Sequence, residues 1–115
     1  MSELIGIARF KFHPGKLEEY KRLSAEAKKI VQAKDPGTLQ YDVFFNDDES
    51  EAIVVERFRD SAALIEHGQN MGEISEAVMK TAEVTGELLG DPSPEIRKRL
   101  ASSDQPRLFT PYQSL

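Results

Sequence analysis

The order in which two hydrophobic periodicities follow each other constrains the fold of this chain more than any single motif does. Segments of alternating or β-branched apolar residues, typical of strands, are separated by segments whose apolar residues recur every three or four positions, typical of helices. Glycine, proline and short polar runs mark the breaks between them. The expected elements are strands at Leu4–Phe12, Thr38–Asn46, Ala52–Phe58 and Val84–Leu89, helices at Lys16–Lys34, after Asp60 and at Ser93–Ala101, and a final extended segment at Arg107–Tyr112.

This order is strand, helix, strand, strand, helix, strand, followed by a C-terminal extension. It is the order of the ferredoxin-like split β-α-β fold, an α+β architecture with both helices on one face of an antiparallel sheet. The first strand is apolar on part of both sides, because Ile5 and Ile7 alternate with Leu4 and Phe10. The helices cover only one face, and a second copy of the chain is the simplest cover for the other. We therefore expect a homodimer.

The second helical segment contains two glycines, Gly68 and Gly72. We expect both to interrupt it, so that a short helix capped by Asp60 is followed by a second helical piece. That interruption would place residues 68–72 at the border of any pocket.

Two parts are expected along the chain: residues 1–92 form the ferredoxin-like domain, and residues 93–115 form the C-terminal helix and extended segment. The extended segment carries Leu108, Phe109 and Tyr112, which a freely solvated tail is not expected to carry. We expect it to pack on the domain or on the partner chain.

Composition excludes several classes of function. A chain of 115 residues without cysteine has no disulfide, thiolate nucleophile or cysteine-bound metal. Its formal net charge of −5 has the wrong sign for a dedicated nucleic-acid binder. The longest apolar stretch, residues 4–8, is far shorter than the roughly 20 residues of a membrane helix. The start of the chain has no basic region followed by an apolar run, so we expect a cytoplasmic location and no membrane partner.

Three segments resemble the antibiotic biosynthesis monooxygenase (ABM) domain. Arg9–Lys16 is similar to its first strand and turn, Asp35–Tyr41 to its entry into the second strand, and Val55–His67 to the strand and helix that follow. They occur in the family's order, and the likeness covers roughly residues 4–89. The resemblance implies a dimeric α+β barrel, in which two ferredoxin-like sheets face each other.

The resemblance also implies an activity: quinol and anthrone monooxygenases of this family use molecular oxygen without flavin, haem or metal. We therefore expect no cofactor, and a quinol- or anthrone-like aromatic as substrate. Haem-degrading relatives use an Asn on the first strand, a Trp and a His. This chain has no Trp, and its first strand has no Asn.

Cofactor-free oxygenation needs a base, hydrogen-bond donors and an apolar cavity that excludes water. His67 is the candidate base, because an unperturbed pKa of about 6.5 suits proton abstraction at neutral pH. It follows Leu64 by three positions and Ala63 by four, and it therefore faces the sheet. The alternative is a core-edge histidine bonded to backbone. His13, at the end of the first strand, is expected on the surface.

Six further residues are candidates for substrate binding: Tyr41, Arg9, Arg57, Phe58, Asn70 and Met71. Tyr41 and Asn70 would donate hydrogen bonds, the two arginines would steady an anion, and Phe58 and Met71 would line the pocket. Each also has a structural alternative. Core packing would explain the apolar and aromatic residues, ion pairing would explain the arginines, and a helix C-cap would explain Asn70.

Other kinds of site have no support in the sequence. The two histidines and scattered acids lack metal-ligand spacing, and no phosphate-binding glycine loop is present. The acidic run at residues 47–51 is expected to be a solvated hairpin tip. Three hypotheses remain: a cofactor-independent monooxygenase, a non-catalytic dimeric module that binds a small apolar ligand, and a structural protein with a filled interior.

Overall fold

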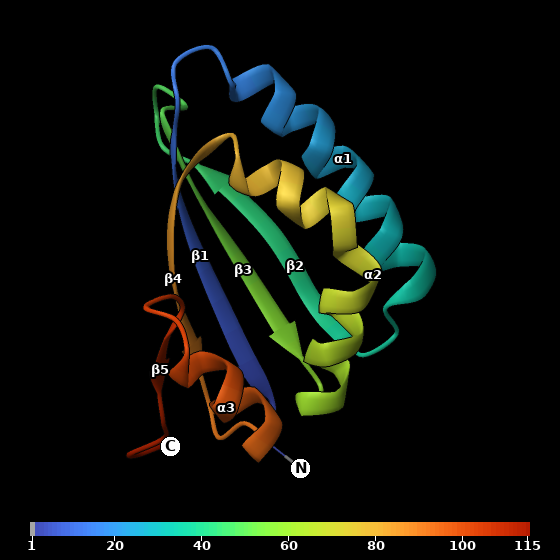
Figure 1. Ribbon diagram of the computed structural model, residues 1–115, viewed down its shortest axis with the longest axis vertical. Helices are drawn as coiled ribbons and strands as arrows, with labels where there is room; N and C mark the ends of the chain where they lie inside the picture. The colour runs from blue at the N-terminus through green and yellow to red at the C-terminus, as the bar shows by residue number, and fades with distance from the viewer. Residues whose placement is uncertain (1) are drawn as a thin grey trace.

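The computed structural model describes residues 2–115, which form a five-stranded sheet with its helices packed on one face (Figure 1). The strand order is β2-β3-β1-β4-β5, antiparallel throughout except for β5, which runs parallel to β4. The α+β, ferredoxin-like fold expected from the sequence is confirmed. The elements are β1 (Leu4–Phe12), α1 (Leu17–Lys34), β2 (Thr38–Phe45), β3 (Glu51–Phe58), α2 (Ser61–Met79), β4 (Ala82–Leu89), α3 (Pro94–Ala101) and β5 (Arg107–Phe109).

The core lies between the sheet and the helices and has two parts. At one end, aromatic rings fill the space: the centroids of Phe12 and Tyr20 are 4.7 Å apart, and Phe10 lies 5.3 Å from Tyr20. At the other end, Leu4 and Phe58 are almost fully buried beside α2 and α3. Both parts depend on the strand alternation of β1, which turns every second residue toward the helices.

α1 is amphipathic and ends in a turn that contacts α2. The backbone N–H of Asp35 closes the helix by donating to the Val31 carbonyl, 3.1 Å away. Two residues later, a Cβ added to Gly37 would lie only 2.4 Å from the Cβ of Ala63 on α2. Only glycine permits this close approach. The turn that carries Asp35 is thereby held against α2.

α2 contains one interruption where the sequence suggested two. Asp60 caps it, as expected, by accepting a hydrogen bond from the Ala63 N–H at 2.9 Å. Gly68 lies inside the helix, and the expectation that it interrupts the segment is wrong. The expected interruption at Gly72 is confirmed, because this residue departs from helical geometry, with φ 39° and ψ −116°, and kinks the segment. A single interior glycine costs only about 1 kcal/mol, which the packing of the neighbouring turns overrides.

The C-terminal segment adds the helix α3 to the domain and the edge strand β5 to the sheet. Ser93 caps α3, and Ile96 is buried in the same cluster as Leu4. β5 pairs with β4 and packs the half-buried Leu108 against that cluster. The strand ends at Phe109, and Tyr112 is 96% exposed on this chain. Contact of this tail with a partner chain stays a prediction.

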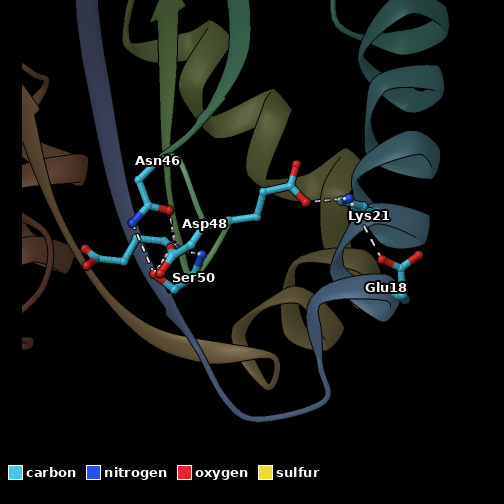
Figure 2. Close-up of polar contacts among 7 residues, drawn as sticks. Glu18, Lys21, Asn46, Asp48 and Ser50 are labelled. Carbon is cyan, nitrogen blue, oxygen red and sulfur yellow. Dashed lines mark hydrogen bonds and ion pairs between the residues drawn. The ribbon is translucent and has the colours of Figure 1, made fainter.

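The acidic run between β2 and β3 forms the tip of a hairpin. Asp48 accepts hydrogen bonds from the backbone N–H and the hydroxyl of Ser50, at 3.0 and 2.6 Å. Lys21 of α1 reaches toward the tip, where its Nζ lies 2.9 Å from Glu49, and it also lies 3.8 Å from Glu18 (Figure 2). These contacts join the hairpin to the N-terminal half of α1.

Candidate functional site

A cleft of about 590 Å³ opens on the helix-covered face of the sheet, between α2, α3 and the segment that leads into β5. The floor of the cleft is formed by Gly6, Ala8 and Gly86, which occupy inward-facing positions of β1 and β4. Their small side chains leave the space above the sheet unfilled. A smaller cavity of about 230 Å³ adjoins it, and Glu56 and Gly68 line both. The volume of the larger cleft is typical of sites for drug-sized ligands.

His67 lines the smaller cavity from the sheet-facing side of α2, next to Gly68, which lines both hollows. It is only 8% exposed. Its Nδ1 is 2.6 Å from Oδ2 of Asp35, and its Nε2 is 3.0 Å from Oε1 of Glu56. The three side chains form a continuous hydrogen-bonded chain that begins in the turn after α1 and ends on β3 at the cleft.

Asp35 is held by a second side chain of α2. It is 4% exposed, and one oxygen accepts a hydrogen bond from the Asn70 amide, which also donates to the Lys34 carbonyl at 3.2 Å. Asn70 follows His67 by three positions, so the two project from the same side of the helix. Both oxygens of Asp35 therefore have a donor from α2, which fixes the carboxylate and, through it, the imidazole ring.

The surroundings of His67 favour its charged form. Burial alone would lower the pKa of the imidazole, but the hydrogen bond and the charge of Glu56, followed by those of Asp35, outweigh it and raise the pKa above its usual value. A protonated ring donates from both nitrogens, which matches an acceptor at each. The ring packs between Phe58 and Tyr41, with centroids 5.2 and 6.0 Å away.

Two phenols, the buried Tyr20 and the half-buried Tyr41, line the smaller cavity. Burial, with a further contribution from the charge of Glu56, raises the pKa of Tyr41. Burial likewise raises the pKa of Tyr20 to about 12. Both hydroxyls stay protonated at neutral pH.

The structure brings five of the seven candidate site residues together. His67, Tyr41 and Met71 line the smaller cavity, and Phe58 lines the larger cleft. Asn70 does not line either hollow, and instead positions Asp35. The alternative of a helix C-cap for Asn70 is wrong, because Asn70 lies within the helix and the residue that departs from helical geometry is Gly72. His13, expected on the surface, is exposed.

Arg9 and Arg57 lie on the opposite face of the sheet. Arg9 is in register with Ile53 and pairs with Glu87 at 3.1 Å, and Arg57 lies 3.1 Å from Glu3. Alternation in the sequence groups residues by side but does not say which side the helices cover, and the arginines fell on the uncovered one. The structure therefore does not bring them to the cleft, and the alternative of ion pairing fits both.

Sequence reasoning missed Glu56 and Asp35 as site residues. A signal existed for Glu56, since it alternates with Ala52, Val54 and Phe58 and is the one acid among the inward-facing residues of β3. Asp35 gave no such signal. Its place in a helix-ending Asp-Pro-Gly turn is explained by local structure alone, and its burial comes from the close approach of α2.

Two kinds of feature are absent from the described residues. Within residues 2–115, no helix is both long enough and apolar enough to cross a membrane. The same part of the chain holds no group of three or more His, Cys, Asp or Glu side chains arranged to bind a metal ion.

Comparison with known proteins gives one family and several related structures. The family model described as antibiotic biosynthesis monooxygenase matches residues 4–79. No curated protein matches the sequence. MupZ from Pseudomonas fluorescens superposes with a TM-score of 0.81 at 22% identity, over 98% of this chain and 93% of its own.

Two further structures match less of the chain. Rv0793 from Mycobacterium tuberculosis gives a TM-score of 0.69 at 23% identity, over 79% of this chain and 96% of its own. A variant of SnoaB from Streptomyces nogalater, described as a cofactor-independent oxygenase, gives 0.65 at 16% identity, over 75% and 89%. At these identities the structures establish a shared fold. The match to MupZ covers 98% of this chain and therefore includes most of the C-terminal segment.

Proposed function

We propose that this chain, which belongs to the antibiotic biosynthesis monooxygenase family, oxygenates a quinol- or anthrone-like aromatic with molecular oxygen and no cofactor. One observation carries the proposal. A buried chain of Asp35, His67 and Glu56 ends at an apolar cleft large enough for such a molecule. The fold shared with SnoaB, described as a cofactor-independent oxygenase, supports it.

Glu56 is the group that accepts the substrate proton in this proposal. Both nitrogens of His67 already face carboxylates, so the ring has no free lone pair directed at the cleft. Glu56 lines the cleft, and its second oxygen lies over the floor, 3.5 Å from where a Cβ on Gly6 would be. The role predicted for His67 thus changes from base to a charge held beside the base.

The reaction follows from that arrangement. Glu56 removes a proton from an acidic C–H or O–H of the substrate, and the imidazolium of His67 stabilises the resulting anion. The anion transfers one electron to oxygen, and the radical pair combines to a peroxide anion. That anion recovers the proton from Glu56, and loss of water leaves a new carbonyl group. One oxygen atom enters the product and the other leaves as water.

Oxygen consumption by the chelator-treated protein tests this function, with anthrones and naphthohydroquinones as substrates and autoxidation subtracted. Glu56→Gln should lower the rate about 100-fold or more, as expected when a general base is removed. Glu66→Gln, on the exposed side of α2, is the matched control and should leave the rate unchanged. Equal rates in wild type and Glu56→Gln would refute the role of Glu56. Saturable binding without oxygen uptake would favour the non-catalytic ligand-binding module.

We also propose that the protein works as a homodimer through the uncovered face of the sheet. That face carries Ile5, Ile7 and Val55 at its centre, and the more exposed Ile53 and Phe44 beside them. An apolar face of this kind marks an interface. Sedimentation of Ile53→Lys should show a monomer, because the new charge would be buried near Arg9. A dimer of unchanged stability in that variant would contradict this interface.

A further inference from the structure

One wall of the cleft comes from the C-terminal segment. Ile96, Arg99 and Leu100 of α3 face the cleft, together with Gln105 and Pro106. The side-chain oxygen of Gln105 accepts a hydrogen bond from the Gly86 N–H at 2.8 Å, which fastens this wall to the cleft floor. The family model matches residues 4–79, so the residues of this wall lie outside the matched part of the chain.

Charge is unevenly distributed around the cleft. Arg99 is the one cationic side chain among the described residues that line it, in a chain whose net charge is −5. Its side chain is 64% exposed and pairs with Glu95 of the same helix at 2.8 Å. Exposed pairs four residues apart contribute little, so the guanidinium is readily available to another anion. Glu56, bonded to His67, is the acid that faces the cleft, whereas the carboxylate of Glu87 pairs with Arg9 on the opposite face of the sheet.

We infer that the cleft binds an aromatic molecule that carries an acidic group, and that Arg99 binds this group at the rim. The aromatic body lies over the apolar floor. Glu56 repels an anion from its end of the cleft, while Arg99 attracts one, so the charges orient the ligand with its neutral, reactive end at Glu56. A rim position also leaves the anion partly hydrated, which avoids most of the cost of burying a charge. The part played by the reactive end rests on the proposed oxygenase function.

Two fluorescent probes with one aromatic body test the inference: 8-anilino-1-naphthalenesulfonate and its uncharged parent, N-phenyl-1-naphthylamine. For each protein the measured quantity is the affinity for the sulfonate divided by the affinity for the parent. This ratio should be higher in the wild type than in Arg99→Gln. The expected loss is about three- to fivefold for the sulfonate alone, the range of an exposed charge pair. Arg97→Gln is the matched control, because Arg97 lies on the same helix but outside the cleft lining and pairs with Asp91.

Gly68→Leu shows whether the probes occupy the cleft. A Cβ at this position meets nothing within 4 Å, so a leucine extends into the space without strain and should weaken both probes alike. If Arg99→Gln leaves the preference for the sulfonate unchanged, or if Arg97→Gln removes it equally, the subsite is refuted. The same is true if Gly68→Leu affects neither probe. Oxygen uptake from neutral anthrones is independent of these results, so the subsite and the oxygenase function stand or fall separately.

Discussion

The two ends of the layer between sheet and helices differ in how they are filled. At one end, Phe10, Phe12 and Tyr20 interlock and leave only the small cavity behind them. Toward the other end, between Phe10 and the buried Leu4, the same strands turn glycine and alanine inward, and the cleft of about 590 Å³ lies above them. The size of the inward-facing residues along β1 and β4 therefore decides where a ligand can bind. The filled end stabilises the fold, and the hollow end is available for chemistry.

The largest expected effect is on stability, at the filled end. Phe10→Ala removes a ring that is 6% exposed and packs on Tyr20. It should lower the free energy of unfolding by about 3–5 kcal/mol, measured by urea denaturation. Leu64→Ala, in the wall of the cleft, should cost clearly less, because its side chain is only half-buried and already borders a hollow. Equal losses in the two variants would show that the ends do not differ as described.

The next effect concerns the buried charges that border the hollow end. Asp35→Asn keeps the shape of the side chain but removes one of the two carboxylates around His67. It should cost about 1–3 kcal/mol of unfolding free energy and lower the pKa of His67. Urea denaturation and an NMR titration of the imidazole measure the two effects. Asp91→Asn, which touches only an exposed pair with Arg97, should change neither, and an unchanged His67 pKa in Asp35→Asn would contradict the coupling.

A smaller effect is the dependence of stability on pH. The pKa of His67 is raised in the folded protein, whereas the unfolded chain has the usual value of about 6.5. The stabilisation is therefore complete below about pH 6.5 and is lost as the pH rises through the folded-state pKa. Unfolding free energies measured across this window should fall in the wild type and not in His67→Gln. His13→Gln, at an exposed position, should follow the wild type, and a fall that persists in His67→Gln would assign the effect to another group.

The smallest change in stability is expected at the cleft floor. A Cβ at Gly6 would meet Glu56 and Phe58 at ordinary contact distances of 3.5 and 3.7 Å, so Gly6→Ala should shift the unfolding free energy by less than about 1 kcal/mol. It should nevertheless weaken ligand binding, because it covers part of Glu56. Gly86→Ala contrasts with it, since its Cβ would lie 2.5 Å from the Ile7 carbonyl oxygen. That variant should be clearly less stable, and a ranking in the reverse order would contradict the described floor.

Much of the fold followed from periodicity, because the order of strands and helices is written in local patterns. The order of elements along the chain and the antiparallel sheet with its helices on one face were predictable for this reason. His67 was found by its place on the sheet-facing side of a helix. Asp35 was not, because its burial depends on the contact between Gly37 and Ala63, which are far apart in the sequence. Arg9 and Arg57 were misplaced because alternation alone does not say which face the helices cover.

The ionisation of a bound phenol tests the central claim most directly. 4-Nitrophenol changes colour when it loses its proton, and it is a small aromatic ligand for the cleft. If Glu56 accepts the proton and His67 stabilises the anion, bound nitrophenol should ionise at a lower pH than the free compound. Glu56→Gln should abolish that shift, and Glu66→Gln should retain it. Nitrophenol that binds with no change in its ionisation, or with the same change in Glu56→Gln, would contradict the assignment of Glu56 as the group that takes the substrate proton.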